Sequence, residues 1–163
     1  MKIDSYISLG SNQGDRELNL LRAVAEIGRM PQSRVTGLSR FYETSPVGEA
    51  VGQTAFYNAV LRLATSLTPA GLLERLAMIE VSLFGRVRSG QCDPRRMDLD
   101  LLFYGEQVID QPGLIVPHPR LAERRFVLQP LSELAPGLRH PLLGKTVGEL
   151  LAGLATGQTV TPL

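Results

Sequence analysis

The chain alternates between two hydrophobic periods, a period of two that is typical of strands and a period near 3.6 that is typical of helices. Residues 55–65 show the strand period most clearly, because Phe56 and Asn58 fall on one face and Tyr57 on the other. Residues 66–85 show the helix period, with Thr68 as N-cap and Pro69 at the first helical position. The whole pattern predicts the order β-α-β-β-α-β with strands at 3–10, 34–44, 55–65 and 94–105, helices from Asp15 and over 66–85, a hairpin of 106–110 and 114–116, and a mostly helical tail from 126 onward.

Each of the two predicted helices carries an apolar stripe that we expect to face the sheet. The stripes comprise Leu18, Leu21, Val24, Ala25 and Ile27 in the first helix and Leu72, Leu76, Ile79 and Leu83 in the second.

The composition predicts a soluble, cytoplasmic protein with a single domain over residues 1–163. This length is enough for one continuous core. The sequence has no run of 18 apolar residues and no charged-then-apolar leader at Met1, so we expect neither a membrane span nor a secretory signal. Cys92 is the only cysteine, which excludes an internal disulfide and a multi-cysteine zinc site.

The net charge of +1 gives no overall attraction to nucleic acid or to anionic membranes, but the cations are unevenly distributed. Of the 17 cationic residues 15 are Arg, and seven of these lie between positions 86 and 125. Arg presents a planar fork of donors that suits bidentate phosphate contacts. A GC-rich genome also favours Arg over Lys, so the cluster is open to both explanations.

Two aspartates interrupt the most strand-like apolar run, "PRRMDLDLLFYG" (94–105). Alternation places Asp98 and Asp100 on one face with Leu102, and an apolar face of Met97, Leu99, Leu101 and Phe103 on the other. Two neighbouring carboxylates suit Mg²⁺, which is commonly held by one or two carboxylates together with substrate phosphates. A solvated strand face is the alternative reading of this pair.

A second group of candidate residues follows in "VPHPRLAERRF" (116–126), where His118 lies between two prolines and close to Arg120, Arg124 and Arg125. Together with the carboxylate pair, such a cationic cluster supplies the two kinds of group that metal-assisted phosphoryl transfer needs. A surface histidine in a rigid turn explains His118 equally well. Glu80 falls at the edge of its helix's apolar stripe, where it either snorkels to solvent or joins a site.

Two short motifs suggest phosphate binding on weaker grounds. "GKT" (144–146) resembles the end of a P-loop, but Arg139 occupies the place of the motif's first glycine, so we expect a helix start with Thr146 and Glu149 as a capping box. "SLGSNQGD" (8–15) lacks the glycine spacing of a dinucleotide-binding turn. A plain tight turn and an anion contact both remain open for it.

Several longer segments occur in one fixed order: "SLGSN", "YETSPVG" followed by "FYNAV", "IEVSLFGRVR", "PRRMDLDLLFYG" and "VPHPRLAERRFVLQPLSELAP". In this order and spacing the chain resembles the 6-hydroxymethyl-7,8-dihydropterin pyrophosphokinase family of folate biosynthesis over nearly its whole length. The resemblance implies an α+β fold with a ferredoxin-like βαββαβ core, an antiparallel sheet, an extra C-terminal hairpin and helices. It also implies transfer of the β,γ-pyrophosphoryl group of ATP to the pterin's hydroxymethyl oxygen, with release of AMP and use of two Mg²⁺ ions.

The resemblance assigns a role to residues on the ATP side and on the pterin side. On the ATP side it implies Asp98 and Asp100 as Mg²⁺ ligands, Arg86 and Arg95 as arginines that close over the reacting groups, His118 and Arg124 as phosphate contacts, and Leu114 and Glu80 as further parts of the ATP site. On the pterin side it implies Thr44, Asn58 and the backbone of Val47 as readers of the pterin edge, with Phe56 and Phe126 stacking on the two faces of the ring.

The sequence also departs from the family pattern. Four residues separate Glu80 from Gly85 where relatives commonly have three. In a continuing helix the one extra residue would rotate everything after it by about 100°. Cys92 stands where some relatives carry tryptophan, and Phe56 replaces a tyrosine. The role of Glu80 is the one most affected.

Two other classes of protein fit parts of the pattern. An RNA-recognition module shares the ferredoxin-like core, but it needs exposed aromatic and basic residues where this chain has two aspartates. A nucleotidyl transferase uses a similar Asp-x-Asp pair, attacks the α phosphorus and releases pyrophosphate. We expect a monomer with ATP and the pterin as ligands and with neither nucleic acid nor membrane as partner.

Overall fold

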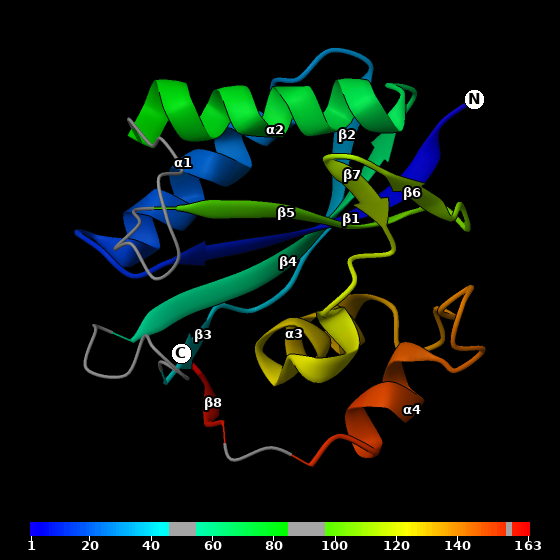
Figure 1. Cartoon of the computed structure of the whole chain (residues 1–163). Coiled ribbons are helices and arrows are strands. Elements are labelled where there is room, and N and C mark those ends of the chain that lie inside the picture. Colours follow the sequence, from blue (N-terminus) through cyan, green and yellow to red (C-terminus); the bar gives the residue numbers. More distant parts are fainter. Residues whose placement is uncertain (46–54, 85–96, 156–157) are drawn as a thin grey trace.

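The structure is a computed structural model that describes residues 1–45, 55–84, 97–155 and 158–163. The βαββαβ order is present, with strand two divided and a hairpin and helices following (Figure 1). The elements are β1 (Ile3–Ser11), α1 (Arg16–Gly28), β2 (Ser33–Leu38), β3 (Tyr42–Thr44), β4 (Phe56–Thr65), α2 (Pro69–Phe84), β5 (Asp98–Tyr104), β6 (Ile109–Gln111), β7 (Leu114–Val116), a 3-10 turn (Leu121–Glu123), α3 (Arg125–Leu134), α4 (Val147–Ala152) and β8 (Val160–Pro162).

The main sheet is antiparallel throughout the described residues, with the strand order β5-β1-β4-β3-β8. β2 also pairs with β4, next to β3. The prediction of a single strand over 34–44 is therefore wrong, because this segment forms two strands. Ser39 lies at the break: its N–H donates to the carbonyl of Val60 and its Oγ accepts the N–H of Val60, both at 2.9 Å. The side chain thus takes the place of a backbone acceptor and lets the strand divide without losing bonds.

Two layers of helices enclose the sheet (Figure 1). α1 and α2 cover one face and bury a cluster that includes Ile7, Leu9, Leu61 and Leu76. α3 and α4 cover the other face, which we call the α3 face, and bury a cluster that includes Val60 and Phe103. The separate hairpin of β6 and β7 extends beyond β5, as the sequence predicted.

The predicted apolar stripe of α1 is wrong at Leu18, Leu21 and Ala25, which are exposed, whereas Val24 and Ile27 face the core as predicted. Leu18 and Leu21 are each 48% exposed, whereas Leu20, Ala23 and Ile27 are fully buried. Leucines at 18, 20 and 21 satisfy two helical registers, so periodicity alone does not choose between them. Asn19 decides between the two registers. Its Nδ2 donates to Ser11 Oγ at 3.1 Å and to the Gln13 carbonyl at 2.9 Å, which turns the side of the helix that carries Asn19 inward.

The predicted start signals of α2 and α4 are confirmed. Thr68 Oγ1 accepts the N–H of Gly71 at the start of α2, and Leu72, Leu76 and Ile79 are buried as predicted. Thr146 and Glu149 form the capping box of α4, so "GKT" is a helix start.

The tail is less helical than predicted. Besides α3 and α4 it contributes β8, whose residues Val160–Pro162 pair with β3 at Tyr42–Thr44. A three-residue strand leaves almost no signal in sequence, because its pairing partner lies more than 100 positions away.

β5 departs from strict alternation after Leu101. The pairing with β1 shifts between Tyr6 and Ile7, so that Leu102 and Phe103 both join the cluster on the α3 face. Phe103 therefore lies opposite to its predicted face, because a β-bulge adds one residue to this strand. The carbonyl of Leu102 accepts the N–H of His118 at 2.9 Å, which places the histidine beside β5.

His140 stabilises the connection before α4 in its neutral form. It is 6% exposed, and its Nδ1 accepts the N–H groups of Leu142 and Leu143, both at 3.1 Å. Burial lowers its pKa below the ordinary value of about 6.5. The unfolded chain therefore binds this proton before the folded chain does, and stability is lost as the pH falls below about 6.5.

We accordingly expect wild type to lose more unfolding free energy between pH 7.5 and pH 5.5 than His140→Asn, by up to about 1 kcal/mol. Asn keeps an acceptor near Nδ1 but carries no titrating group, and urea titrations at the two pH values measure the difference. The control is His118→Asn, which removes the chain's other histidine. It should keep the part of the pH-dependent loss of unfolding free energy that comes from His140. Parallel losses in wild type and His140→Asn would contradict the assignment.

None of the described helices is both long and apolar enough to cross a bilayer.

Candidate active site

A row of three residues lies on the α3 face near one end of the paired strands β1, β4 and β5. Gly10 on β1 pairs with Asn58 on β4 and with Asp98 on β5, so all three share one level of the sheet. Neighbouring residues in an antiparallel ladder point to the same face. Asn58 and Asp98 therefore flank Gly10 on one side of the sheet, and the two halves of the predicted site adjoin each other there.

Gly10 also belongs to the candidate site, whereas the sequence predicted it as the end of the first strand and as part of a tight turn or an anion contact. A Cβ atom at this position would lie 2.8 Å from Asn58 Oδ1 and 3.7 Å from Phe56 Cδ1. The Asn58 amide thus rests directly on the backbone of β1, which only glycine permits. The glycine at the end of the predicted strand 3–10 was the available signal, because a glycine in a strand often marks a close approach of another group.

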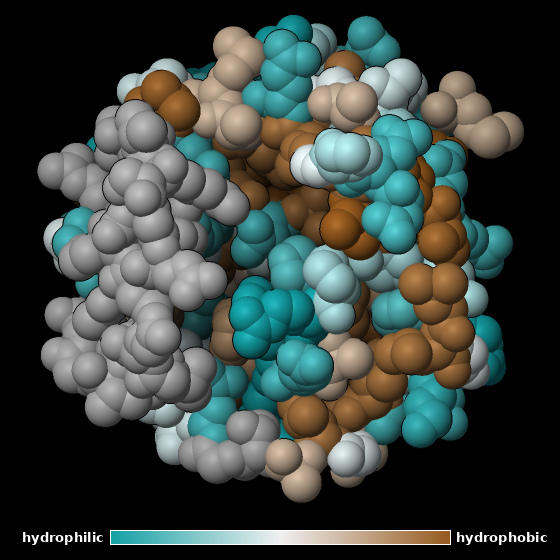
Figure 2. All heavy atoms as spheres, in the orientation of Figure 1, coloured by the Kyte–Doolittle hydropathy of each residue, from teal (hydrophilic) through white to brown (hydrophobic). Residues whose placement is uncertain are grey.

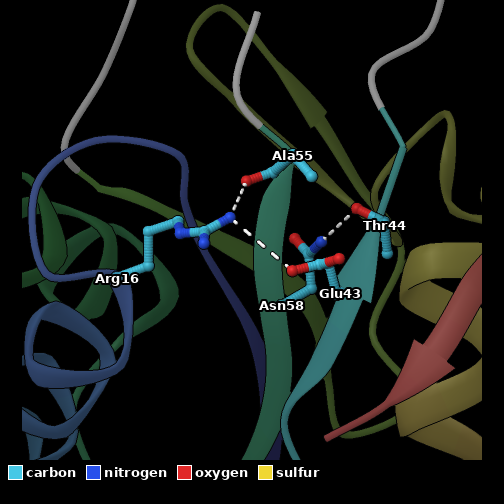
Figure 3. Close-up of polar contacts among 5 residues, drawn as sticks. All are labelled: Arg16, Glu43, Thr44, Ala55 and Asn58. Carbon is cyan, nitrogen blue, oxygen red and sulfur yellow. Dashed lines mark hydrogen bonds and ion pairs between the residues drawn. The ribbon is translucent and has the colours of Figure 1, made fainter.

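The predicted pterin-side residues Thr44, Phe56 and Asn58 come together on β3 and β4. Asn58 is buried, and its Nδ2 donates to Thr44 Oγ1 at 2.7 Å (Figure 3). This bond fixes the amide with Oδ1 toward Gly10. Phe56 and Asn58 share a face, as the alternation predicted. A buried amide held in one orientation can read the donor and acceptor pattern of a flat heterocycle.

Phe126, the remaining predicted pterin-side residue that the structure describes, lies in the helical layer above the α3 face. It lies in the first turn of α3 and packs against the cluster on the α3 face, to which Val60 of β4 also belongs. The guanidinium carbon of Arg124 lies 5.5 Å from the centroid of the Phe126 ring.

Asp98 and Asp100 are both half-buried on β5, and their charges reach the cationic residues before α3. Burial lowers the pKa of His118 most, Asp100 raises it, and Arg124 and Arg120 lower it. Burial likewise lowers the pKa of Arg124 most, Arg120 adds to this, and Asp100 and Asp98 oppose it. The structure therefore brings the predicted carboxylates and cations into one electrostatic environment.

The His118 ring has a defined orientation. Its Nδ1 accepts the N–H of Arg120 at 3.2 Å. With its pKa lowered, the ring is uncharged at neutral pH, and Nε2 carries the hydrogen. His118 is thus a neutral donor, and the permanent positive charge beside it belongs to Arg124.

Glu80 neither snorkels nor lies on the surface. It is 6% exposed, and its Oε2 accepts the N–H of Leu99 at 2.8 Å. Leu99 stands between the two aspartates, so this bond from α2 fixes the part of β5 that carries them. α2 continues through Phe84, four residues beyond Glu80, and residues 85–96 lie outside the described part of the chain.

A pocket of about 320 Å³ opens between α2, β5 and β7. Apolar residues form most of its wall, including the predicted Leu114, while Glu80, Asp100 and His118 supply polar groups. Figure 2 shows this pocket below α2 as an apolar recess, with hydrophilic atoms beside it at the centre of the view. An apolar slot with convergent polar groups at one end suits a flat base that carries an anionic extension.

Three predicted site residues, Val47, Arg86 and Arg95, fall outside the described residues, and so does Cys92. Within 1–45, 55–84, 97–155 and 158–163 no group of three or more His, Cys, Asp or Glu residues comes together as a metal site. The roles of all predicted site residues stay predictions.

Comparisons with known proteins put the chain in the class of ATP-dependent pyrophosphokinases, as the sequence predicted. The family described as 7,8-dihydro-6-hydroxymethylpterin-pyrophosphokinase (HPPK) matches residues 6–136. The chain belongs to this family.

Two bacterial relatives illustrate the similarity, both named 2-amino-4-hydroxy-6-hydroxymethyldihydropteridine pyrophosphokinase. The Pseudomonas aeruginosa protein is 43% identical over 147 residues, which cover 90% of this chain and 89% of the relative. The Methylorubrum extorquens protein is 45% identical over 151 residues, which cover 92% of each.

Among solved structures, wild-type HPPK-DHPS of Plasmodium falciparum with STZ-DHP matches with a TM-score of 0.74. The match covers 93% of this chain and 43% of that longer chain, at 14% identity. At this identity the likeness shows the fold, and it confirms the predicted ferredoxin-like α+β class.

Proposed function

We propose that the chain transfers the β,γ-pyrophosphoryl group of ATP to the hydroxymethyl oxygen of 6-hydroxymethyl-7,8-dihydropterin and releases AMP. The observation that carries this proposal is the row Asn58, Gly10 and Asp98. It sets an amide suited to a heterocycle next to a carboxylate suited to a metal-phosphate group, with one glycine between them. Acceptor and donor would thus meet above Gly10, and positioning is the main contribution a protein makes to phosphoryl transfer.

The acceptor half consists of β3, β4 and the start of α3. Thr44 holds the amide of Asn58 in one orientation, and Asn58 in turn reads the edge of the pterin. Phe56 comes from the sheet and Phe126 from the helix that covers it, and they supply the two stacking faces. The backbone of Val47 would complete the edge contacts.

The donor half consists of β5, the His118–Arg124 segment and the pocket beside α2. His118 donates through Nε2 and Arg124 through its guanidinium to phosphate oxygens, while Leu114 contacts the base. Glu80 forms part of the same pocket wall and holds β5 in place. Arg86 and Arg95 would add positive charge around the transferred group.

The residues present fit Mg²⁺. Asp98 and Asp100 offer hard oxygen ligands on one half-buried face, and two carboxylates leave room for the phosphates and waters that this ion keeps. When bound, Mg²⁺ neutralises charge on the transferred phosphates. We propose a cytoplasmic monomer for the protein as a whole.

The test is a chromatographic analysis of all products. With ATP, Mg²⁺ and 6-hydroxymethyl-7,8-dihydropterin we expect AMP and the pterin diphosphate in equal amounts, with neither ADP nor free pyrophosphate accumulating. Omission of the pterin should abolish AMP formation. Release of pyrophosphate would indicate nucleotidyl transfer instead, and a complete lack of pterin-dependent turnover would contradict the proposal.

A further inference from the structure

Arg16, the first residue of α1, makes three different contacts with β3, with β4 and with Ala55 just before β4. Figure 3 shows two of them, those with Glu43 and Ala55. Arg16 Nη1 donates to the carbonyl of Ala55 at 2.7 Å and lies 3.8 Å from Glu43 Oε2. Its guanidinium carbon also lies 4.0 Å from the centroid of the Tyr57 ring. A planar guanidinium can bond in its plane and stack through its face at the same time, which an ammonium group cannot.

These contacts fall next to the candidate pterin residues but on the other face of the strands. Ala55 and Tyr57 flank Phe56, and Glu43 directly precedes Thr44. Glu43 pairs with Tyr57, one step along the ladder from the pair Thr44 and Phe56. Arg16 therefore holds the backs of the two strands whose fronts carry Thr44, Phe56 and Asn58.

The strands need such support because the ladder between them is short. β3 pairs with β4 at only three positions, and Ala55 lies beyond the last of them. The Thr44–Asn58 hydrogen bond of 2.7 Å spans the two strands, so any change in their separation also turns the Asn58 amide. The contacts of Arg16 with Ala55 and Glu43 join the two strands at the end of the ladder that leads into residues 46–54.

Arg16 is itself well positioned. Asp15 caps α1 by accepting the N–H of Leu18, and Asn19, which is 7% exposed, holds the turn before the helix through Ser11 and Gln13. Only 23% of the Arg16 side chain is exposed. The guanidinium is therefore held from its own helix and from the strands, and little conformational freedom remains to be lost when a ligand binds.

We infer that Arg16 is a positioning residue for the acceptor: it holds β3 and β4 at the separation at which Thr44 fixes Asn58 for recognition of the pterin. This inference rests on the proposed function and extends it to a residue that does not touch the substrate. Among the residues that the structure describes, Arg16 contacts Ala55, Glu43 and Tyr57 on the pterin side and makes no contact with β5, His118 or Arg124. Its loss should thus affect the acceptor and leave ATP binding unchanged.

The experiment compares Arg16→Ala with Arg29→Ala, a control at the other end of the same helix whose guanidinium bonds Glu26 at the surface. For Arg16→Ala we expect the KM for the pterin to rise about tenfold, with kcat and the KM for ATP within about twofold of wild type. Arg16→Lys should recover part of the loss, because it keeps the charge and one donor but not the planar stack. Arg29→Ala should match wild type in all three constants.

A readout without substrate accompanies the kinetics. In two-dimensional amide NMR the side-chain NH₂ signals of Asn58, assigned from Asn58→Ala, should shift in Arg16→Ala and stay in place in Arg29→Ala. An unchanged pterin KM, or equal losses in all constants that follow the melting temperature, would overturn the inference. If wild type itself turned over no pterin, the proposed function and the acceptor role of Arg16 would both fail, whereas a shifted Asn58 signal would still report the contact.

Discussion

Asp98→Asn and Asp100→Asn should each lower kcat/KM at least about 100-fold, which corresponds to about 2.7 kcal/mol of transition-state stabilisation. Asparagine keeps the volume of aspartate but removes the charge that would hold Mg²⁺ beside the phosphates. Because both side chains lie on a half-buried face and asparagine keeps an acceptor, the melting temperature should stay within about 4 °C of wild type. Steady-state rates and thermal melts measure the two quantities.

The control is Asp4→Asn, an exposed aspartate on the same sheet at the far end of β1. It removes one negative charge without touching the row of Asn58, Gly10 and Asp98, and its rate should equal that of wild type. A titration with Mg²⁺ adds a second comparison, since both site variants should need more of the ion than Asp4→Asn. Near-normal turnover in both site variants would remove the metal assignment.

Gly10→Ala should raise the KM for the pterin at least about tenfold and leave the KM for ATP within about twofold of wild type. The added Cβ would lie 2.8 Å from Asn58 Oδ1, so the amide must leave the position in which Thr44 holds it. A displacement of a fraction of an ångström is enough to spoil hydrogen bonds to a bound heterocycle. The two KM values, measured at saturating concentration of the other substrate, give the result.

Two further variants separate this effect from general damage. Gly137→Ala adds the same methyl group where nothing lies within 4 Å, and it should behave as wild type. In an Asn58→Ala variant the amide that the new Cβ of Gly10→Ala would contact is absent. Adding Gly10→Ala to that variant should therefore raise its pterin KM by much less than tenfold. Additive effects of the two changes would show that Gly10 does not act through Asn58.

The family could be identified from the order and spacing of a few characteristic sequence segments, and the matched residues 6–136 confirm it. The βαββαβ order could be predicted because its strands and helices are long enough for their periods to show. Capping at Thr68 and Thr146 was predictable for a similar reason, since a cap is a local hydrogen bond between residues three positions apart.

Some of the site could also be predicted and is brought together in the fold. Asn58 and Phe56 share a face, and Asp98 and Asp100 lie near His118 and Arg124 as expected. Their catalytic and binding roles stay predictions. Of the two alternatives for Glu80, snorkelling is wrong. The sequence could not exclude it, because the partner of Glu80, the N–H of Leu99, belongs to a different element.

The sequence by itself determined the family, the fold class and the residue types of the site, because these depend on local spacing and on side-chain chemistry. Only the tertiary structure decided which face of α1 is buried, where β5 bulges, and that β8 joins the sheet, since each depends on a partner distant in the chain. It alone placed Gly10 beneath Asn58 and Arg16 behind β3 and β4. The physical reason is that a period or a cap is fixed by neighbours along the chain, whereas a close approach exists only after distant strands have paired.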